Sequence, residues 1–349
     1  MSPWTSPEFD NHEQVVCFTD PASGLRAIIA IHSTALGAAA GGTRFKAYES
    51  DAAALDDALR LSRAMSYKCA LAGVPCGGGK AVIIGDPGQL KSPALFHAYG
   101  RFLNRIGSTF ATGEDVGMSV ADIETVRAVS PYVGGTSTGG AGDPSIHTAV
   151  GVMHGLRAVL EQRLQTETFR GVKVAVQGLG AVGWGVAQRL HAAGAELTVA
   201  DVREDVVARA VAEFGATAAA PDAIHAAPVD IFSPCALGGV ITVQSAQAIR
   251  AVAVAGAANN QLASAAAGEA LAARGILYAP DYVINAGGIV SGMEEYFKMP
   301  GRNGVEGPPL ADRLAAIHDR LAEIFNRAAR EKRPPEATAE QMARELIGR

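Results

Sequence analysis

Apolar and polar residues follow a strand rhythm and then a helix rhythm along the first part of the chain. Short apolar runs at 15–18 and 25–32 flank the turn-forming segment 20–24, which predicts two neighbouring strands. From Ser50 onward, apolar residues recur every three or four positions, which predicts a helix to about Lys68 with Ser50 as its N-cap. Further helices are predicted at 91–106, 122–129 and 148–164, and a strand at 109–117.

Beyond residue 170 the pattern changes to short apolar runs separated by helical stretches. Such runs are typical of strands that are buried on both faces. They lie at 174–176, 197–200, 229–232, 251–255 and 277–278. Repeated alternation of strand and helix predicts a doubly wound parallel sheet. Amphipathic helices at about 312–330 and 337–347 follow this sheet in the sequence.

A glycine motif joins the first strand of this region to the helix that follows it. Gly178, Gly180 and Gly183 have the G-x-G-x-x-G spacing, in which the glycines allow a tight turn, close approach of a pyrophosphate, and close helix–strand packing. The alternative is a βαβ unit without a cofactor. Asp201 ends the next strand and can bind both hydroxyls of an adenosine ribose, which favours NAD over NADP. Arg203, two residues further on, suits a 2′-phosphate and leaves NADP open.

Composition narrows the class of protein. A length of 349 residues suggests about two domains, and the hydrophobic fraction of 48% is enough for real cores. The net charge of -5 argues against a nucleic-acid partner. No apolar run has the length of a membrane span, and the first residues do not form a signal peptide. The four cysteines lack metal-type spacing. We therefore expect a soluble cytoplasmic protein with reduced thiols and no metal site.

Lys80 is the first candidate for chemistry. It ends the segment 73–80, which resembles a P-loop but has Val74 and Ala81 where that motif needs Gly and Ser or Thr. The segment also runs into a predicted strand rather than a helix, so no nucleoside triphosphate is implied. A lysine between a glycine run and a buried strand can lose its proton near neutral pH and become a base. A lysine that simply leaves a loop into water is the alternative.

Two further positions carry charge where the pattern predicts burial. Lys68 continues the apolar stripe of its helix, so its side chain either reaches out to water at the helix end or points into a cleft. Glu114 and Asp115 lie near the end of the strand predicted at 109–117, where active-site residues of α/β proteins gather. Either carboxylate could be functional, and capping of the next helix is the competing role.

Together these segments resemble the amino-acid dehydrogenases of the glutamate/leucine/phenylalanine/valine dehydrogenase family, from about Glu13 to Gly348. The matching motifs are GGTRF (41–45), MSYKCALAG and GGGKAVIIGDP (within 65–87), TGEDVG (112–117), AGDPSIHTAVGV (141–152), QGLGAVG (177–183), PCALGGV (234–240), GAANNQL (256–262) and YAPDYVINAGG (278–288).

The family resemblance implies a particular α/β fold. It comprises an N-terminal α/β substrate domain with a mixed sheet at 1–137, followed by a Rossmann-type doubly wound NAD-binding domain at 138–310. C-terminal helices at 311–349 are expected to pack back across the cleft towards the first domain. The Gly/Ser/Thr-rich segment 134–142 is the expected hinge. Homo-oligomers are also implied, without a preferred number of subunits.

The resemblance also implies a reaction, in which an L-amino acid, NAD and water give the 2-oxo acid, ammonium and NADH. Lys80 would be the general base, Asp115 would exchange a proton with the substrate amine, and Lys68 would bind the substrate carboxylate. Further implied substrate contacts are Ala40, Gly41, Met65, Gly113, Asn259 and Ile289. Implied cofactor contacts are Arg44 and Thr148 near the nicotinamide, with Gly178, Leu179, Gly180, Ala181, Val182, Gly183, Asp201, Val202, Cys235, Ala236, Ala258 and Asn260.

The choice of amino acid depends on the side-chain pocket. Gly113 stands where leucine-preferring relatives tend to have alanine, and Ala40 where many have leucine, so both favour phenylalanine. The N-terminal third looks more like the branched-chain enzymes, and Ile289 fits either substrate. Glutamate is disfavoured because no additional pocket lysine is evident. A 2-hydroxy acid dehydrogenase would need a His–carboxylate pair with a substrate-facing arginine, and a non-catalytic NAD-binding regulator would not need Lys68, Lys80 and Asp115 together.

Overall fold

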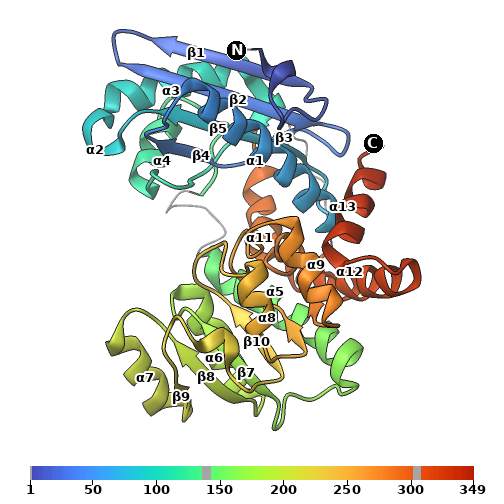
Figure 1. The fold of residues 1–349 in the computed structure, drawn as a ribbon. Helices are drawn as coiled ribbons and strands as arrows, with labels where there is room; N and C mark the ends of the chain where they lie inside the picture. The colour runs from blue at the N-terminus through green and yellow to red at the C-terminus, as the bar shows by residue number, and fades with distance from the viewer. Residues whose placement is uncertain (1, 136–142, 302–307) are drawn as a thin grey trace. The chain divides into compact units, whose positions relative to one another are not determined.

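The computed structural model describes residues 2–135, 143–301 and 308–349, which form two compact units (Figure 1). Unit 1 comprises Met1–Gly142, Gly292–Gly307 and Ala343–Arg349; unit 2 comprises Asp143–Ser291 and Pro308–Met342. The domain boundary predicted at 137/138 and most of the expected hinge lie outside the described residues.

Beyond residue 291 the two units divide the chain differently from the predicted domains. Helix α12 (Leu310–Glu331) packs on α5 (Pro144–Val159), so it belongs to unit 2 rather than to the first domain. Its buried face explains this placement, because it supplies apolar side chains such as Ile317 and Leu321 that lie against glycines of α5. Helices α11 (Gly287–Tyr296) and α13 (Pro335–Leu346) each begin in unit 2 and end in unit 1.

Unit 1 is built on a mixed sheet, as predicted. Its strands are β1 (Gln14–Asp20), β2 (Leu25–Ser33), β3 (Ala39–Ala40), β4 (Thr43–Lys46), β5 (Gly77–Ile84) and β6 (Phe110–Ala111). The order is β1-β2-β5-β3-β6, with β4 also paired to β5. The pairs β1–β2 and β2–β5 are antiparallel, whereas β3 and β4 run parallel to their partners.

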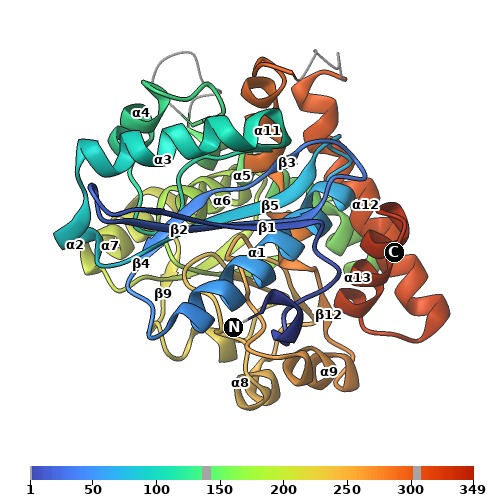
Figure 2. The same ribbon diagram turned by 90° about the horizontal axis from the view of Figure 1, so that it is seen from above.

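Helices cover both faces of this sheet (Figure 2). One face packs on α3 (Pro93–Ile106) and α4 (Val120–Arg127), and the other on α1 (Asp51–Leu71); the short α2 (Pro87–Leu90) precedes α3. Successive side chains of a strand point to opposite faces. Ile83 of β5 therefore lies in the core under α3, while Val82 lies in the core under α1. Ser50 caps α1 by accepting a hydrogen bond from the Ala53 amide, as the sequence predicts.

Two local predictions in unit 1 differ from the structure. The glycines before Lys80 belong to strand β5 rather than to a loop. They are glycines because a Cβ on Gly78 would lie 2.1 Å from the Ser66 amide nitrogen of α1, and one on Gly79 would lie 2.6 Å from the Phe110 ring. The strand predicted at 109–117 is reduced to β6, because the chain beyond it turns, with Gly117 at φ +82° against the Phe45 carbonyl.

Unit 2 contains the predicted doubly wound parallel sheet. Its strands are β7 (Lys173–Gln177), β8 (Glu196–Ala200), β9 (Thr217–Ala218), β10 (Ile231–Pro234), β11 (Ala253–Val254) and β12 (Leu277–Tyr278). They are all parallel, in the order β12-β11-β10-β7-β8-β9. Chain order reverses beside β7, which is the point where such sheets bind ligands.

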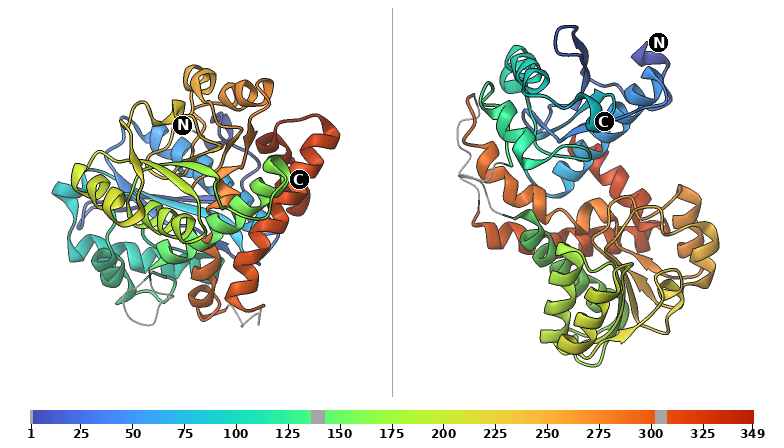
Figure 3. Two further views of the ribbon diagram at one scale, coloured as in Figure 1. Left: turned by 90° about the horizontal axis from the view of Figure 1, so that it is seen from below. Right: turned by 90° about the vertical axis from the view of Figure 1, so that its left-hand side faces the viewer.

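Helices lie on both faces of this sheet (Figure 3). They are α5, α6 (Ala181–Ala192), α7 (Glu204–Phe214), α8 (Val243–Ala248), α9 (Ala265–Ala273) and α10 (Asp281–Ile284). The core beneath α8 and α9 includes Phe232, Val254 and Leu271. The sequence did not predict α8, α9, α10 or α11, which are short helices in alanine- and glycine-rich stretches. None of the helices in the described residues has the length and apolar character that a membrane span needs.

Candidate active site

Lys80 lies in the middle of β5, on the face of the sheet that α1 covers. Val82, two residues further along the same strand, packs into the core beneath α1, so Lys80 points to the same side. Only 6% of its surface is exposed. A lysine is rarely buried to this degree without a partner, so the neighbouring charges decide its state.

Asp115 is the partner of this lysine. Its Oδ2 forms an ion pair with Lys80 Nζ and a second one with Arg44 Nε, at 3.2 Å. The next helix, α4, is capped instead by Ser119 and Asp122, and Glu114 is exposed. Asp115 rather than Glu114 therefore faces Lys80, and helix capping does not explain it.

The pKa values of this pair are set by burial and by each other. Burial lowers the pKa of Lys80, and Arg44 lowers it further, whereas Asp115 and the more distant Asp57 oppose the shift. Burial alone would raise the pKa of Asp115, but Lys80 and Arg44 beside it hold that pKa below its usual range. The site therefore combines an amine whose pKa is lowered with a carboxylate whose pKa is also lowered, as a base and its electrostatic partner require.

Glycines bring the backbone close around this pair. A Cβ on Gly41 would lie 1.8 Å from the Gly79 carbonyl oxygen, and one on Gly42 would lie 2.6 Å from the Glu114 carbonyl oxygen. Residues 41 and 42 thus pack directly against β5 and the segment that carries Asp115. Gly41 also faces Met65, whose Cγ would be 3.5 Å from a Cβ at that position. The structure therefore brings the predicted substrate contacts Gly41 and Met65 together.

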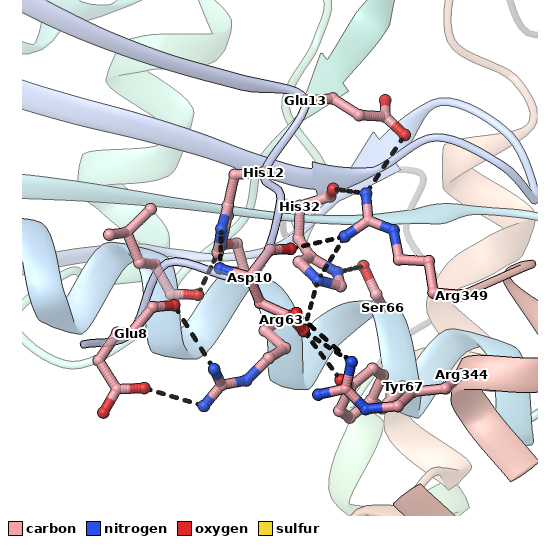
Figure 4. A network of polar contacts seen from close by, with 12 residues as sticks. Glu8, Asp10, His12, Glu13, His32, Arg63, Ser66, Tyr67, Arg344 and Arg349 are labelled. Atoms are coloured by element: carbon pink, nitrogen blue, oxygen red, sulfur yellow. Dashed lines mark hydrogen bonds and ion pairs between the residues drawn. The ribbon is translucent and has the colours of Figure 1, made fainter. Parts of the chain in front are cut away.

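Lys68 is half-buried in the last turn of α1, three residues after Met65. A polar network shown in Figure 4 holds the C-terminal end of α1 against β2. Tyr67 donates a hydrogen bond to Asp10, and Ser66 Oγ lies 2.8 Å from Nδ1 of the buried His32. Burial lowers the pKa of His32 to about 3, so its ring is neutral at working pH. These contacts fix the C-terminal end of α1. Binding of a substrate carboxylate by Lys68 stays a prediction.

The positions on which the substrate choice was argued also lie in unit 1. Ala40 is buried in β3, between β5 and β6. Gly113 follows β6, and a Cβ there would lie 3.2 Å from the Gly134 carbonyl oxygen. An alanine at 113 would thus need only a small shift of the backbone at 134. Gly113 is not required by backbone conformation, which leaves a role in side-chain selection open.

In unit 2 the three motif glycines occupy different environments. Gly178 has φ +93°, and a Cβ on it would lie 2.6 Å from the Ala236 Cβ. A Cβ on Gly183 would lie 2.0 Å from the Gly178 carbonyl oxygen and 3.1 Å from the Cys235 Cβ. Around Gly180 no atom of the described residues lies within 4 Å of the Cβ position. The turn and the packing contact are thus filled by protein, while the middle glycine faces open space, as dinucleotide binding requires.

The N-terminus of α6 and Asp201 complete this end of the sheet. Gly180 precedes α6 without any side-chain cap, so the first amides at Ala181 and Val182 remain available to an anion. Asp201 accepts hydrogen bonds from the Leu179 amide (2.7 Å) and the Arg203 amide (3.0 Å). Burial would raise the pKa of Asp201, but these hydrogen bonds and the Arg203 charge lower it. Its neighbour Val202 is 86% exposed.

Three loops converge on the same edge of the sheet. Cys235 and Ala236 contact the motif glycines, and a Cβ on Gly238 would lie 2.6 Å from the Asn259 carbonyl oxygen. The Asn259 side chain accepts a hydrogen bond from Asn285 Nδ2, at 2.7 Å. Ala258 and Asn260 flank Asn259 in this loop. The Ala258 amide donates a backbone hydrogen bond to Pro234 at the end of β10, and the Asn260 carbonyl accepts one from Gly239 in the following turn.

The remaining predicted residues of unit 2 lie at α5 and α11. Thr148 Oγ1 bonds to the Pro144 carbonyl and lies 3.0 Å from the Cβ position of Gly288. Ile289 is the next residue of α11 and is partly exposed. The structure thus places Thr148 beside Gly288 at the start of α11, one residue before Ile289. Their predicted contacts with nicotinamide and substrate stay predictions.

The structure also shows polar residues that the sequence analysis did not single out. Asp57 of α1 binds Arg44 Nη1 at 3.0 Å, and Tyr48 donates a hydrogen bond to the same carboxylate, at 2.9 Å. Arg44, predicted near the nicotinamide, is therefore engaged between two carboxylates of unit 1. In the sequence, the only feature that could have pointed to Asp57 was its position as a carboxylate beside the apolar stripe of a predicted helix. Among the described residues no cluster of His, Cys, Asp and Glu suits a metal ion.

Comparison with known proteins agrees with this arrangement. Residues 12–148 match the family model described as Glu/Leu/Phe/Val dehydrogenase, dimerisation domain. Residues 139–210 and 197–334 match the model described as Glutamate/Leucine/Phenylalanine/Valine dehydrogenase. The chain belongs to the glutamate/leucine/phenylalanine/valine dehydrogenase family. The resemblance inferred from the sequence motifs is thereby confirmed.

Individual relatives of this family cover nearly the whole chain. A leucine dehydrogenase of Geobacillus stearothermophilus is 44% identical over 339 residues, covering 97% of this chain and 91% of that protein. A valine dehydrogenase of Streptomyces albus is 45% identical over 341 residues, covering 96% and 92%. The crystal structure of L-tryptophan dehydrogenase from Nostoc punctiforme has a TM-score of 0.85 at 40% identity, covering 97% and 96%. The protein is an amino-acid dehydrogenase of a family that depends on NAD or NADP.

Proposed function

We propose that this dehydrogenase catalyses the reversible, NAD-dependent oxidative deamination of a branched-chain L-amino acid, leucine or valine. The chemistry is supported above all by the buried pair of Lys80 and Asp115. The substrate is supported by relatives named leucine and valine dehydrogenases, at 44% and 45% identity over 97% and 96% of the chain. Phenylalanine, favoured from Gly113 and Ala40, receives no such support.

NAD is proposed as the cofactor because of the charge on Asp201. NAD, when bound, accepts the hydride that leaves the α-carbon of the substrate. Gly180 would let the pyrophosphate approach the backbone, and the free amides at the start of α6 would bind its oxygens. The Asp201 carboxylate would accept hydrogen bonds from the ribose hydroxyls and repel a 2′-phosphate. Arg203, whose Nε lies 3.5 Å from Asp201 Oδ1, partly offsets that repulsion.

The residues of unit 1 would hold the substrate and move its protons. Lys68 would bind the carboxylate of the amino acid through its ammonium group. Loss of hydride from the α-carbon of the neutral amine leaves an iminium ion, which water must attack. The Lys80 amine would take a proton from that water, because burial makes its neutral form accessible. Asp115 would exchange a proton with the departing amine and balance the positive charge of the iminium ion.

A substrate panel tests this proposal. NADH or NADPH formation is measured with L-leucine, L-valine, L-phenylalanine and L-tryptophan at alkaline pH, with L-lactate as the control. We expect the largest kcat/KM with leucine or valine and NAD. A preference for phenylalanine would restore the argument from Gly113 and Ala40 and discard the branched-chain assignment. A preference for NADP would overturn the role given to Asp201.

We also propose that the protein works as a homo-oligomer. Residues 12–148 match a family model that is described as a dimerisation domain. Strand β1 is an edge strand of the unit 1 sheet, and edge strands readily pair with a second copy. Light scattering of the purified protein would reveal the number of subunits, and a monomer at assay concentration would contradict the proposal. The cytoplasmic location stays a prediction from the sequence.

A further inference from the structure

Arg44 lies between two carboxylates, and only one of them belongs to the proposed catalytic pair. Its Nε lies 3.2 Å from Asp115 Oδ2, and its Nη1 lies 3.0 Å from Asp57 Oδ2. The exposed fractions of the three side chains are 19% for Arg44, 21% for Asp115 and 13% for Asp57. A guanidinium can bind two carboxylates at once because its donors form a rigid fork. The two contacts therefore fix its plane.

Asp57 is itself held firmly on helix α1. Its Oδ2 accepts a hydrogen bond from the Tyr48 hydroxyl (2.9 Å), and its Oδ1 accepts one from Arg60 Nη2 (2.7 Å). Burial alone would raise the pKa of Asp57, but Tyr48, Arg44 and Arg60 lower it below its usual range. Asp57 is therefore a fixed negative charge across the working range of pH.

Strand pairing explains why these groups meet. Arg44 of β4 is opposite Val82 of β5 in the parallel register, so it lies just beyond Lys80 on the face covered by α1. Arg44 and Lys80 both contact the same oxygen, Asp115 Oδ2. The result is a row of alternating charges in the order Asp57, Arg44, Asp115 and Lys80.

We propose that Asp57 and Arg44 are positioning residues that orient Asp115 and tune the protonation of Lys80. This inference rests on the roles proposed above for Lys80 and Asp115. Asp57 would not touch the substrate; it would act through Arg44, which holds the Asp115 carboxylate against the lysine. In this arrangement residues of α1 and β4 would set the orientation of the Asp115 carboxylate beside Lys80. That orientation would then depend less on a bound substrate.

The charges in this row have opposite effects on Lys80. The positive charge of Arg44 lowers the pKa of Lys80, while the negative charge of Asp57 raises it. Tyr48 and Arg60 also face Asp57, and Asp115 faces the lysine directly. If Lys80 must be neutral to act as a base, its pKa sets the acid limb of the pH profile of kcat/KM. Removing Asp57 or Arg44 should therefore shift this limb in opposite directions.

The test compares Arg44→Gln and Asp57→Asn with the wild-type enzyme. We expect the acid limb to move to higher pH in Arg44→Gln and to lower pH in Asp57→Asn, each by roughly half a pH unit or more. Both variants should lose about tenfold or more in kcat, because Asp115 is no longer oriented. Arg44→Lys keeps the charge but cannot bridge two carboxylates, so it should lose kcat with little shift of the limb.

A matched control is Asp51→Asn, the same substitution on the same helix. Asp51 is exposed and pairs with Arg26 at the surface, so this variant should keep both the rate and the pH profile of the wild type. Acid limbs that stay in place, or move in the same direction, in Arg44→Gln and Asp57→Asn would overturn the inference. If Arg44→Gln does not fold, the two other variants still differ in their expected limb, which moves to lower pH in Asp57→Asn and shifts little in Arg44→Lys.

The Lys80→Ala variant separates this inference from the proposed function. Wild-type turnover in Lys80→Ala would remove the proposed base and, with it, the meaning of the acid limb. Loss of turnover in Lys80→Ala, together with an unmoved limb in Arg44→Gln and Asp57→Asn, would leave the function intact and reject only the positioning roles.

Discussion

The candidate sites of the two units are built in opposite ways. Unit 1 has charged side chains that are already paired, with Lys80 and Arg44 both bound to Asp115 beneath α1. Unit 2 has bare backbone at its candidate site, with Gly180 facing open space and the first amides of α6 uncapped. The candidate site of unit 1 thus consists of charged side chains, whereas that of unit 2 consists of accessible backbone at glycines.

This difference reflects what each site has to do. A buried lysine must be paired, since an isolated charge in a protein interior is costly. The pairing would also set the protonation state of the proposed base. A pyrophosphate, in contrast, brings its own charge and needs only amides and room. Substitutions in unit 1 should therefore change turnover and its pH dependence, whereas substitutions at the glycines should change cofactor affinity.

The largest effect is expected for Lys80→Ala. Removal of the proposed general base should lower kcat by on the order of 10³-fold, because positioned acid–base groups contribute factors of this size. Fluorescence titration should show nearly unchanged NADH binding, because the candidate cofactor residues of the glycine motif lie in unit 2. Lys91→Ala removes a lysine paired with Asp122 near the surface of unit 1 and should leave kcat unchanged. Comparable turnover in Lys80→Ala and wild type would reject Lys80 as the base.

The glycine motif offers a comparison within unit 2. In Gly180→Ala the new Cβ meets no described atom, so the melting temperature should hold while NADH binds roughly tenfold more weakly. In Gly183→Ala the Cβ would lie 2.0 Å from the Gly178 carbonyl oxygen, so the free energy of unfolding should fall by about 1–3 kcal/mol. Calorimetry with and without NADH distinguishes the two variants. Equal affinity of Gly180→Ala and wild type would show that the cofactor does not approach this glycine.

A smaller effect is expected for Asp201→Asn. The substitution keeps a hydrogen-bonding oxygen for the Leu179 amide but removes the charge that disfavours a 2′-phosphate. Loss of charged hydrogen bonds to the ribose should lower kcat/KM for NAD, and the ratio for NAD over NADP should fall by about tenfold. The ratio is measured with one saturating amino acid. An unchanged ratio would mean that Arg203, rather than Asp201, governs the choice.

Much of the molecule could be predicted from periodicity and short motifs. The antiparallel β1–β2 pair, the Ser50 cap of α1 and the parallel sheet of unit 2 follow from local patterns that the structure retains. The glycine motif was informative because each glycine has a separate steric reason. Lys80 and the pair Glu114 and Asp115 were candidates because charges adjoined predicted strands, and the family resemblance singled out Asp115.

The remaining features depend on contacts between segments far apart in the chain. The glycines before Lys80 looked like a loop, because only the packing of Ser66 and Phe110 shows why a strand there has no side chains. Asp57 was missed for a similar reason: a carboxylate on a helix is ordinary until the register of β4 places Arg44 beside it. Local patterns predict elements, whereas such pairings follow from the sheet as a whole.

The smallest effect is expected for a buried carboxylate of unit 2, which contrasts with the paired charges of unit 1. It measures how much stability such a carboxylate costs. Glu336 of α13 lies in unit 2, and its Oε2 is buried without a hydrogen-bond partner in the described part of the chain. Burial raises the pKa of Glu336, and the nearby Glu269 adds to the rise. The folded protein thus holds the proton more tightly than the unfolded chain, so this residue lowers stability as pH rises above its unfolded value of 4.5.

Glu336→Gln should remove that loss. We expect the free energy of unfolding at pH 7 to rise by roughly 1 kcal/mol, with no gain below about pH 4.5, where the carboxyl is protonated in both states. Urea titrations at both pH values measure this, with the exposed Glu340→Gln on the same helix as the control. A gain of the same size at both pH values would point to packing against Gly268 rather than to charge. Equal stability of variant and wild type at pH 7 would show that unit 2 holds this carboxylate at no cost.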